Sequence, residues 1–171
     1  VMGAWMTFLC DELVPALEAQ FDCGGTGRRG VFGKSSGGYG AIIHAMKRAD
    51  CWAAAACHSG DMAFELCYLP DMPNTLRSLA RHQGSIERFM TALEESYARK
   101  VGGNDTHVLM ILAMAASYDP APEEPFGIRL PVTLDTCEII KERWERWLDW
   151  DPVRLVDRHL LVGCAVYEQH G

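Results

Sequence analysis

A serine between glycines, placed between two apolar stretches, is the feature that most restricts the fold of this chain. Gly33-Lys34-Ser35-Ser36-Gly37 fits the pattern G-x-S-x-G and follows the apolar pair Val31-Phe32. Residues 41–46, Ala-Ile-Ile-His-Ala-Met, follow with the pattern of an amphipathic helix. This order predicts a strand, a tight turn and a helix, which is the setting of a nucleophile elbow.

The chemistry of such an elbow explains the residue types at these positions. A nucleophilic serine must lie on a strained turn, and small residues two before and two after it let strand and helix pack closely. The N–H group of the next residue, Ser36, points toward the same space and can donate to an oxyanion. The positive end of the helix dipole is directed there as well. We therefore expect Ser35 to be the nucleophile and Ser36 to be an oxyanion donor.

Two other interpretations of the motif are open. Gly-Lys-Ser also ends the phosphate-binding pattern G-x-x-x-x-G-K-[ST], which would need glycine where this chain has Arg28. That loop also needs a flexible approach, whereas Val31 and Phe32 continue a strand up to Gly33. The second alternative is a glycine-rich turn between strand and helix without any chemistry.

Composition excludes several classes of function. The 171 residues, with 49% hydrophobic and 23% charged residues, are typical of one globular domain with its own core. A net charge of −7 argues against nucleic acid or an anionic membrane as the main partner. We expect no membrane-spanning helix, since no apolar run approaches about 20 residues. The first residues lack a basic region, so no signal peptide is expected.

Cysteine and histidine usage suggests a reducing compartment and no metal. Seven cysteines are scattered without C-x-x-C spacing, which favours free thiols and a cytoplasmic location over a disulfide framework. Six histidines show neither H-E-x-x-H nor a cluster with cysteine. We therefore expect no bound metal and no cofactor.

The first part of the chain predicts alternating helices and strands. Residues 4–20 have an apolar stripe at helical spacing, with a kink expected near Pro15. The elbow strand is expected over 30–34 and its helix over 36–48. Residues 52–58 predict a short strand of a parallel sheet that is covered on both faces.

Polar residues follow that strand directly. His58 and Asp61 come at its carboxyl end, where open α/β sheets bind their ligands. We expect both to contact substrate, with a plain strand-to-loop transition as the alternative. His44, on the elbow helix, is expected to be a packing residue.

Residues 70–155 form a long excursion before the next strand, which we expect over 160–165. We predict one domain over 1–171, with 70–155 as a helical insertion of the kind that caps an active site. Asp151 and Pro152 are expected at the N-cap and first position of a helix. The apolar spacing predicts three helices within the insertion, over 84–100, 105–117 and 136–149.

Four segments, in their order along the chain, match the sequence pattern of a known family. They are Asp11-Glu12-Leu13-Val14-Pro15, the run from Gly33 to Ala41, Lys47-Arg48-Ala49-Asp50, and Ala53 to Gly60. Together they resemble the putative-esterase branch of the α/β-hydrolases, which includes S-formylglutathione hydrolases, feruloyl and enterochelin esterases and mycolyltransferases. The resemblance is close over residues 5–70 and loose over 120–170. It implies an α/β-hydrolase-like, mostly parallel sheet flanked by helices.

The resemblance also implies where the remaining catalytic residues lie. In the family the catalytic acid follows the strand after the cap, and Glu168 occupies that place, where aspartate is usual. The triad histidine lies tens of residues further on, and His170 is too close to Glu168 to replace it. The first strands of the sheet precede the elbow in the family. We therefore expect this chain to be the middle of an α/β-hydrolase, cut at both ends.

The sequence thus predicts a serine hydrolase of carboxylic esters that acts through an acyl-enzyme. An acyltransferase is the close variant, since only the acceptor differs. The alternative is a catalytically impaired fragment that serves as a non-enzymatic or oligomeric binding protein. The expected partners are a small-molecule ester and a second copy of the chain.

Overall fold

The computed structural model describes residues 3–96, 103–158 and 165–169. The chain divides into two compact units. The sheet unit comprises Gly3–Ala63 and Trp150–Gly171, and the helical unit comprises Phe64–Asp149. Within the described ranges, no helix has the length and apolar character needed to cross a membrane.

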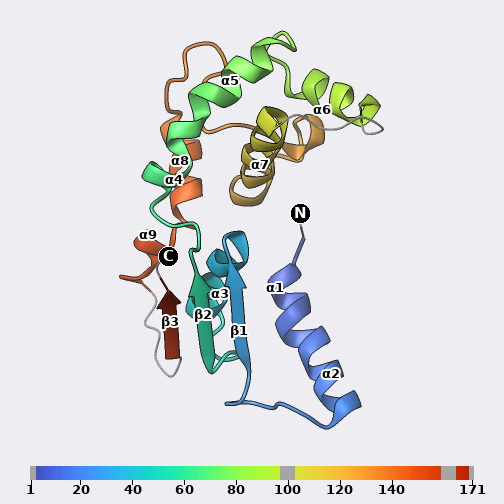
Figure 1. The fold of residues 1–171 in the computed structure, drawn as a ribbon, viewed down its shortest axis with the longest axis vertical. Coiled ribbons are helices and arrows are strands. Elements are labelled where there is room, and N and C mark those ends of the chain that lie inside the picture. Colours follow the sequence, from blue (N-terminus) through green and yellow to red (C-terminus); the bar gives the residue numbers. More distant parts are fainter. Residues whose placement is uncertain (1–2, 97–102, 159–164, 170–171) are drawn as a thin grey trace. The chain divides into compact units, whose positions relative to one another are not determined.

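The sheet unit is built on three parallel strands in the order β1-β2-β3 (Figure 1). They are β1 (Gly30–Lys34), β2 (Ala54–His58) and β3 (Ala165–Gln169). The strand predicted over 30–34 is confirmed, and the one predicted over 52–58 begins two residues later. Lys34, His58 and Gln169 lie in register, so the carboxyl ends of the strands meet at one edge.

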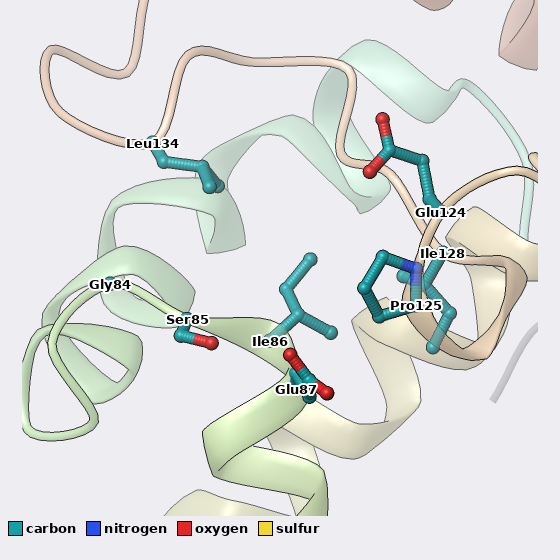
Figure 2. A pocket seen from close by; sticks show the side chains of 8 residues that line it. All are labelled: Gly84, Ser85, Ile86, Glu87, Glu124, Pro125, Ile128 and Leu134. Atoms are coloured by element: carbon teal, nitrogen blue, oxygen red, sulfur yellow. The ribbon is translucent and has the colours of Figure 1, made fainter.

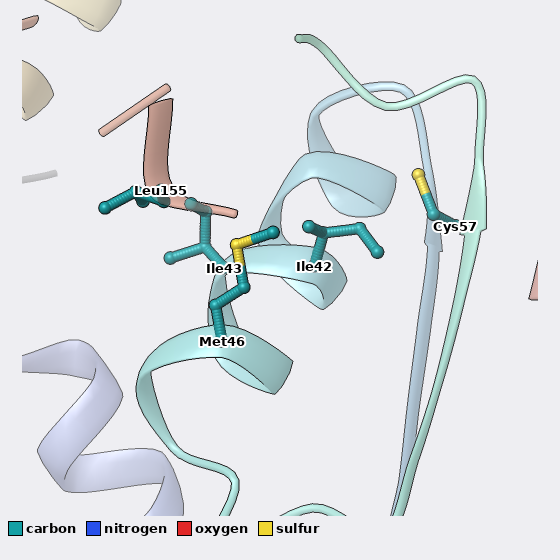
Figure 3. Packing of buried hydrophobic residues seen from close by; sticks show 5 residues of the cluster. All are labelled: Ile42, Ile43, Met46, Cys57 and Leu155. Carbon is teal, nitrogen blue, oxygen red and sulfur yellow. The ribbon is translucent and has the colours of Figure 1, made fainter. Parts of the chain in front are cut away.

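Helix α3 (Ser36–Lys47) covers one face of this sheet. Its side chains Ile42, Ile43 and Met46 pack with Cys57 of β2 and with Leu155 (Figure 3). The expectation that both faces are covered is wrong for the described residues. Burial alternates along β2, and Phe32 of β1 is 85% exposed. The second face is therefore open.

The predicted N-terminal helix is present but changes its winding. It consists of α1 (Trp5–Thr7), the π-helix η1 (Phe8–Leu13) and α2 (Val14–Phe21). Pro15 has no N–H, so the Asp11 carbonyl loses its i+4 donor. The Val14 N–H bonds instead to the Leu9 carbonyl, five residues back. The expected kink is thus taken up by a π-turn.

The apolar stripe of this helix does not form its buried face. Four of the stripe's five residues, Trp5, Phe8, Leu13 and Leu17, are exposed, whereas the fifth, Leu9, is half-buried. The buried residue is Cys10, which packs with Cys51 and Trp52. The stripe was predicted from regular α-helical spacing, and the π-turn changes that spacing.

An ion pair joins the end of α2 to the start of β1. The Arg29 Nε and Nη2 atoms donate to the Glu18 carboxylate at 2.8 and 2.6 Å. The N–H of Gly25 donates to the same carboxylate at 2.7 Å. These hydrogen bonds, those from Arg29 first, lower the pKa of Glu18 from 4.5 to about 2.

The helical unit contains more helices than the sequence pattern predicts. The helices predicted over 84–100, 105–117 and 136–149 correspond to α6 (Ile86–Glu95), α7 (Gly103–Tyr118) and α8 (Lys141–Leu148). The short helices before residue 84 were not predicted, because Pro70 and Pro73 resemble breaks although each stands near a helix start. The elements are α4 (Phe64–Cys67), η2 (Leu69–Asp71), α5 (Met72–Ala80), α6 (Ile86–Glu95), α7 (Gly103–Tyr118), η3 (Pro125–Gly127) and α8 (Lys141–Leu148).

Aromatic rings in mutual contact form part of the core of the helical unit. Phe64 of α4 and Tyr68, the residue after α4, lie edge to face, with ring centroids 4.8 Å apart. Tyr118, at the end of α7, lies 5.3 Å from Trp147 of α8. Trp144 and Trp147 are both buried. The contacts join the beginning and the end of the unit.

A buried acid next to this core holds two arginines. Asp119 is 2% exposed and accepts two hydrogen bonds from Arg129, each of 2.8 Å. Arg146 of α8 approaches the same carboxylate at 2.8 Å. Two cations thus compensate the burial of one charge.

Residues 150–155 belong to a different unit from the one that the sequence predicted. The sequence assigned it to the helical insertion, whereas it belongs to the sheet unit. Its short helix α9 (Pro152–Leu155) begins as predicted, with the Asp151 side chain accepting the Val153 N–H at 3.1 Å. Leu155 packs against α3, which explains the assignment.

Candidate active site

Ser35 lies at the turn between β1 and α3, as the motif predicts. Its backbone has φ 55° and ψ −126°, a region that residues with a Cβ occupy rarely. Such strain costs about 1–3 kcal/mol and persists only where the surroundings impose it. The side chain is exposed at the carboxyl edge of the sheet.

Two backbone hydrogen bonds hold this conformation. The N–H of Ser35 donates to the His58 carbonyl at 2.9 Å. Its carbonyl accepts the N–H of Tyr39, in the first turn of α3, at 3.0 Å. The serine is therefore fixed both to the neighbouring strand and to its own helix.

Three glycines allow the close approach of strand, helix and loop. A Cβ on Gly33 would lie 2.2 Å from the carbonyl atoms of Gly37. A Cβ on Gly38 would lie 3.0 Å from the His58 carbonyl, and one on Gly60 would lie 2.6 Å from the Tyr39 nitrogen. A Cβ on Gly37 would meet nothing within 4 Å. The contacts thus require a residue without a side chain at Gly33, as predicted, but they do not require one at Gly37.

Ser36 is the first residue of α3 and presents its N–H at the helix start. This N–H finds no acceptor among the described residues, as expected for the first amides of a helix. The Ser36 hydroxyl donates to Asp61 Oδ2 at 3.3 Å. Ser36 and Asp61, predicted separately, therefore lie together beside the nucleophile.

The loop from His58 to Ala63 is fixed at several points. Ser59 and Ala63 both have positive φ angles, of 50° and 52°. The N–H of Ala63 donates to Asp151 Oδ1 at 3.0 Å, and Asp151 is fully buried. Sequence reasoning identified Asp151 as an N-cap and missed this second bond, which spans 88 residues and leaves no local signal.

The structure places the other predicted site residues on neighbouring strands. His58 is the last residue of β2, and its side chain is exposed. Glu168 was predicted to follow a strand over 160–165, but it lies within β3, in register with Cys57. It is thus one residue before the carboxyl end of that strand. Residues 160–164 lie outside the described residues.

Among the described residues of the sheet unit, the imidazole ring of neither His44 nor His58 hydrogen-bonds to the Ser35 hydroxyl. His44 Nδ1 instead accepts the indole N–H of Trp52 at 3.2 Å, in agreement with a packing role. Burial, and then the charge of Arg48, lower the pKa of His44. His170 lies outside the described residues.

A separate shallow pocket of about 190 Å³ lies in the helical unit (Figure 2). It is formed by the start of α6 and the segment 124–134, and its apolar wall includes Ile86, Ile128 and Leu134. It contains none of the predicted site residues.

The sequence is similar to a known protein family. The sequence matches the model of a family described as Putative esterase over residues 2–161. The matched range includes the elbow, the loop after β2 and the helical unit. A search of curated proteins gives no match.

Proposed function

This chain belongs to the Putative esterase family, and from that premise we propose that Ser35 is the nucleophile of a serine ester hydrolase. Esterase activity is the general function of the family, and its fold is that of the α/β-hydrolases. The observation that carries the proposal is the strained backbone of Ser35 between β1 and α3. A turn without chemistry has no reason to keep this strain.

The proposed reaction proceeds in two steps. The Ser35 Oγ attacks the ester carbonyl carbon while its proton passes to a general base, and the Ser36 N–H stabilises the oxyanion. The alcohol then leaves with that proton, and water hydrolyses the acyl-enzyme to free the acid and Ser35. Glu168 is proposed to orient the histidine that serves as base. His58 and Asp61 are proposed to contact the substrate.

Reaction with a fluorophosphonate tests this proposal, since the reagent captures only activated serines. We expect one adduct per chain in the intact mass, located at Ser35 by peptide mapping. Ser35→Ala should abolish the adduct. Ser59→Ala is the matched control, because Ser59 is also exposed with a positive φ but precedes no helix; this variant should keep the adduct. Labelling that survives Ser35→Ala would overturn the assignment.

The catalytically impaired binding protein remains the second candidate. The observation in its favour is that no described imidazole ring of the sheet unit hydrogen-bonds to the Ser35 hydroxyl, and a serine without a base is a weak nucleophile. Absence of any adduct would favour this candidate. If Ser35 is labelled, transfer to an added alcohol acceptor, measured beside hydrolysis, separates an acyltransferase from an esterase.

A further inference from the structure

A carboxylate lies beside the proposed oxyanion donor. Asp61 Oδ2 accepts the hydroxyl of Ser36 at 3.3 Å, and the N–H of the same Ser36 is the proposed partner of the substrate carbonyl oxygen. The carbonyl oxygen belongs to the acyl group, which stays attached to Ser35 after the alcohol has left. Asp61 is therefore close to the acyl part of the substrate throughout the reaction.

The loop holds Asp61 in this place. Before it, Gly60 packs against the backbone of α3, where a Cβ would meet the Tyr39 nitrogen at 2.6 Å. After it, the N–H of Ala63 is bonded to the buried Asp151. A carboxylate fixed on both sides loses little conformational freedom when it binds a ligand.

We propose that Asp61 selects acyl groups that carry a hydrogen-bond donor near the scissile carbonyl, with an ammonium group preferred over a hydroxyl. This proposal rests on the proposed function of Ser35. A carboxylate has about four acceptor sites, so it can bind a substrate donor while it keeps its bond to Ser36 and its other interactions. A hydrogen bond between two charged groups is stronger than one to a neutral group, which gives the order of preference. A carboxylate on the acyl group would instead be repelled.

Four 4-nitrophenyl esters of similar size test this proposal: 3-aminopropanoate, 3-hydroxypropanoate, butanoate and the monoester of succinate. The acylation rate is measured from the release of 4-nitrophenol and divided by each ester's spontaneous rate in buffer. We expect kcat/KM for the amino ester to exceed that of butanoate by about tenfold. The hydroxy ester should be intermediate and the succinate ester slowest. Salt should reduce the advantage of the amino ester.

Variants identify the group responsible for this preference. For each protein we take the ratio of kcat/KM for the amino ester to kcat/KM for the butanoate ester. Asp61→Asn removes the charge but keeps an oxygen that can accept the Ser36 hydroxyl, and it should lower the ratio severalfold. Ser36→Ala keeps the charge of Asp61 and should keep the ratio. Asp22→Asn makes the same change of net charge at the exposed end of α2, and it should leave the ratio as in the unmodified chain.

The outcomes separate this inference from the function on which it rests. A ratio near one, together with fluorophosphonate labelling of Ser35, would overturn the role of Asp61 and leave the hydrolase proposal standing. A ratio that Asp61→Asn leaves unchanged would do the same. Absence of both labelling and turnover would overturn both proposals.

Discussion

At the scale of single residues, the elbow is defined by close backbone contacts. Gly33, Gly38 and Gly60 belong to three different elements, and a Cβ on any of them would lie within 3.1 Å of neighbouring backbone. Backbone atoms cannot move aside as the end of a flexible side chain can. The strained Ser35 is therefore maintained by packing around it, as well as by its two hydrogen bonds.

The two glycines of G-x-S-x-G should respond differently to alanine. Gly33→Ala places a methyl group 2.2 Å from the carbonyl atoms of Gly37, so β1 and α3 must separate. We expect a loss of about 3 kcal/mol in the free energy of unfolding, together with loss of fluorophosphonate labelling. Gly37→Ala places its methyl group in open space within a helix. That variant should be as stable as the unmodified chain, or more stable by up to about 1 kcal/mol.

Urea unfolding of both variants, followed by circular dichroism, measures this difference. Equal destabilisation by the two substitutions would contradict the contacts described here. A stable Gly33→Ala variant that still reacts at Ser35 would do so as well.

The positions of site residues could be predicted only where the signal is local. Ser35 and Ser36 follow from the five consecutive residues Gly33 to Gly37 and from the order of strand and helix. The hydrogen bond from Ser36 to Asp61 spans 25 residues, so the sequence places both near the pocket without joining them. The bond from Ala63 to Asp151 has no sequence signal at all, because an aspartate before a proline is already explained as an N-cap.

At the scale of elements, types were predicted better than boundaries. Strand β1 was predicted with its observed ends, because a glycine-rich loop precedes it and the elbow serine follows it. Helix α6 begins near the predicted residue, where Ser85 caps it by accepting the Arg88 N–H. Strand β3 covers Ala165–Gln169, and of the strand predicted over 160–165 only Ala165 lies among the described residues.

The ion pair between α2 and β1 predicts how stability depends on pH. The folded-state pKa of Glu18 is about 2, below its ordinary value of 4.5. Between these values the unfolded chain binds more protons than the folded one, so stability rises with pH. The contribution of Glu18 is complete above about pH 5 and is lost as the pH falls toward 2.

Thermal unfolding between pH 2.5 and 7 measures this contribution. Glu18→Gln should show a flatter fall of the melting temperature below pH 4.5 than the unmodified chain does. Glu12→Gln is the matched control, since Glu12 is an exposed glutamate of the same N-terminal helical segment. Identical acid profiles for Glu18→Gln and the unmodified chain would show that the pair does not stabilise the fold.

At the scale of the whole molecule, the open face of the sheet is the feature least expected from the sequence. Parallel sheets normally have both faces covered, and the apolar composition of residues 52–58 predicted the same here. In the described residues α3 covers one face, while Phe32 stands 85% exposed on the other. Strands β1 and β3 are also the two edge strands of the sheet formed by the described residues. Burial of such surfaces usually requires another segment or another chain.

We therefore expect the isolated chain to associate with a second copy through the face that carries Phe32. Phe32→Lys should lower the average mass measured by size-exclusion chromatography with light scattering, because a charge on that face resists burial. Leu66→Lys is the matched control: Leu66 is 80% exposed, but it belongs to α4 of the helical unit. Its variant should associate as the unmodified chain does. A monomer of the unmodified chain at micromolar concentration, or equal effects of the two substitutions, would contradict association through this face.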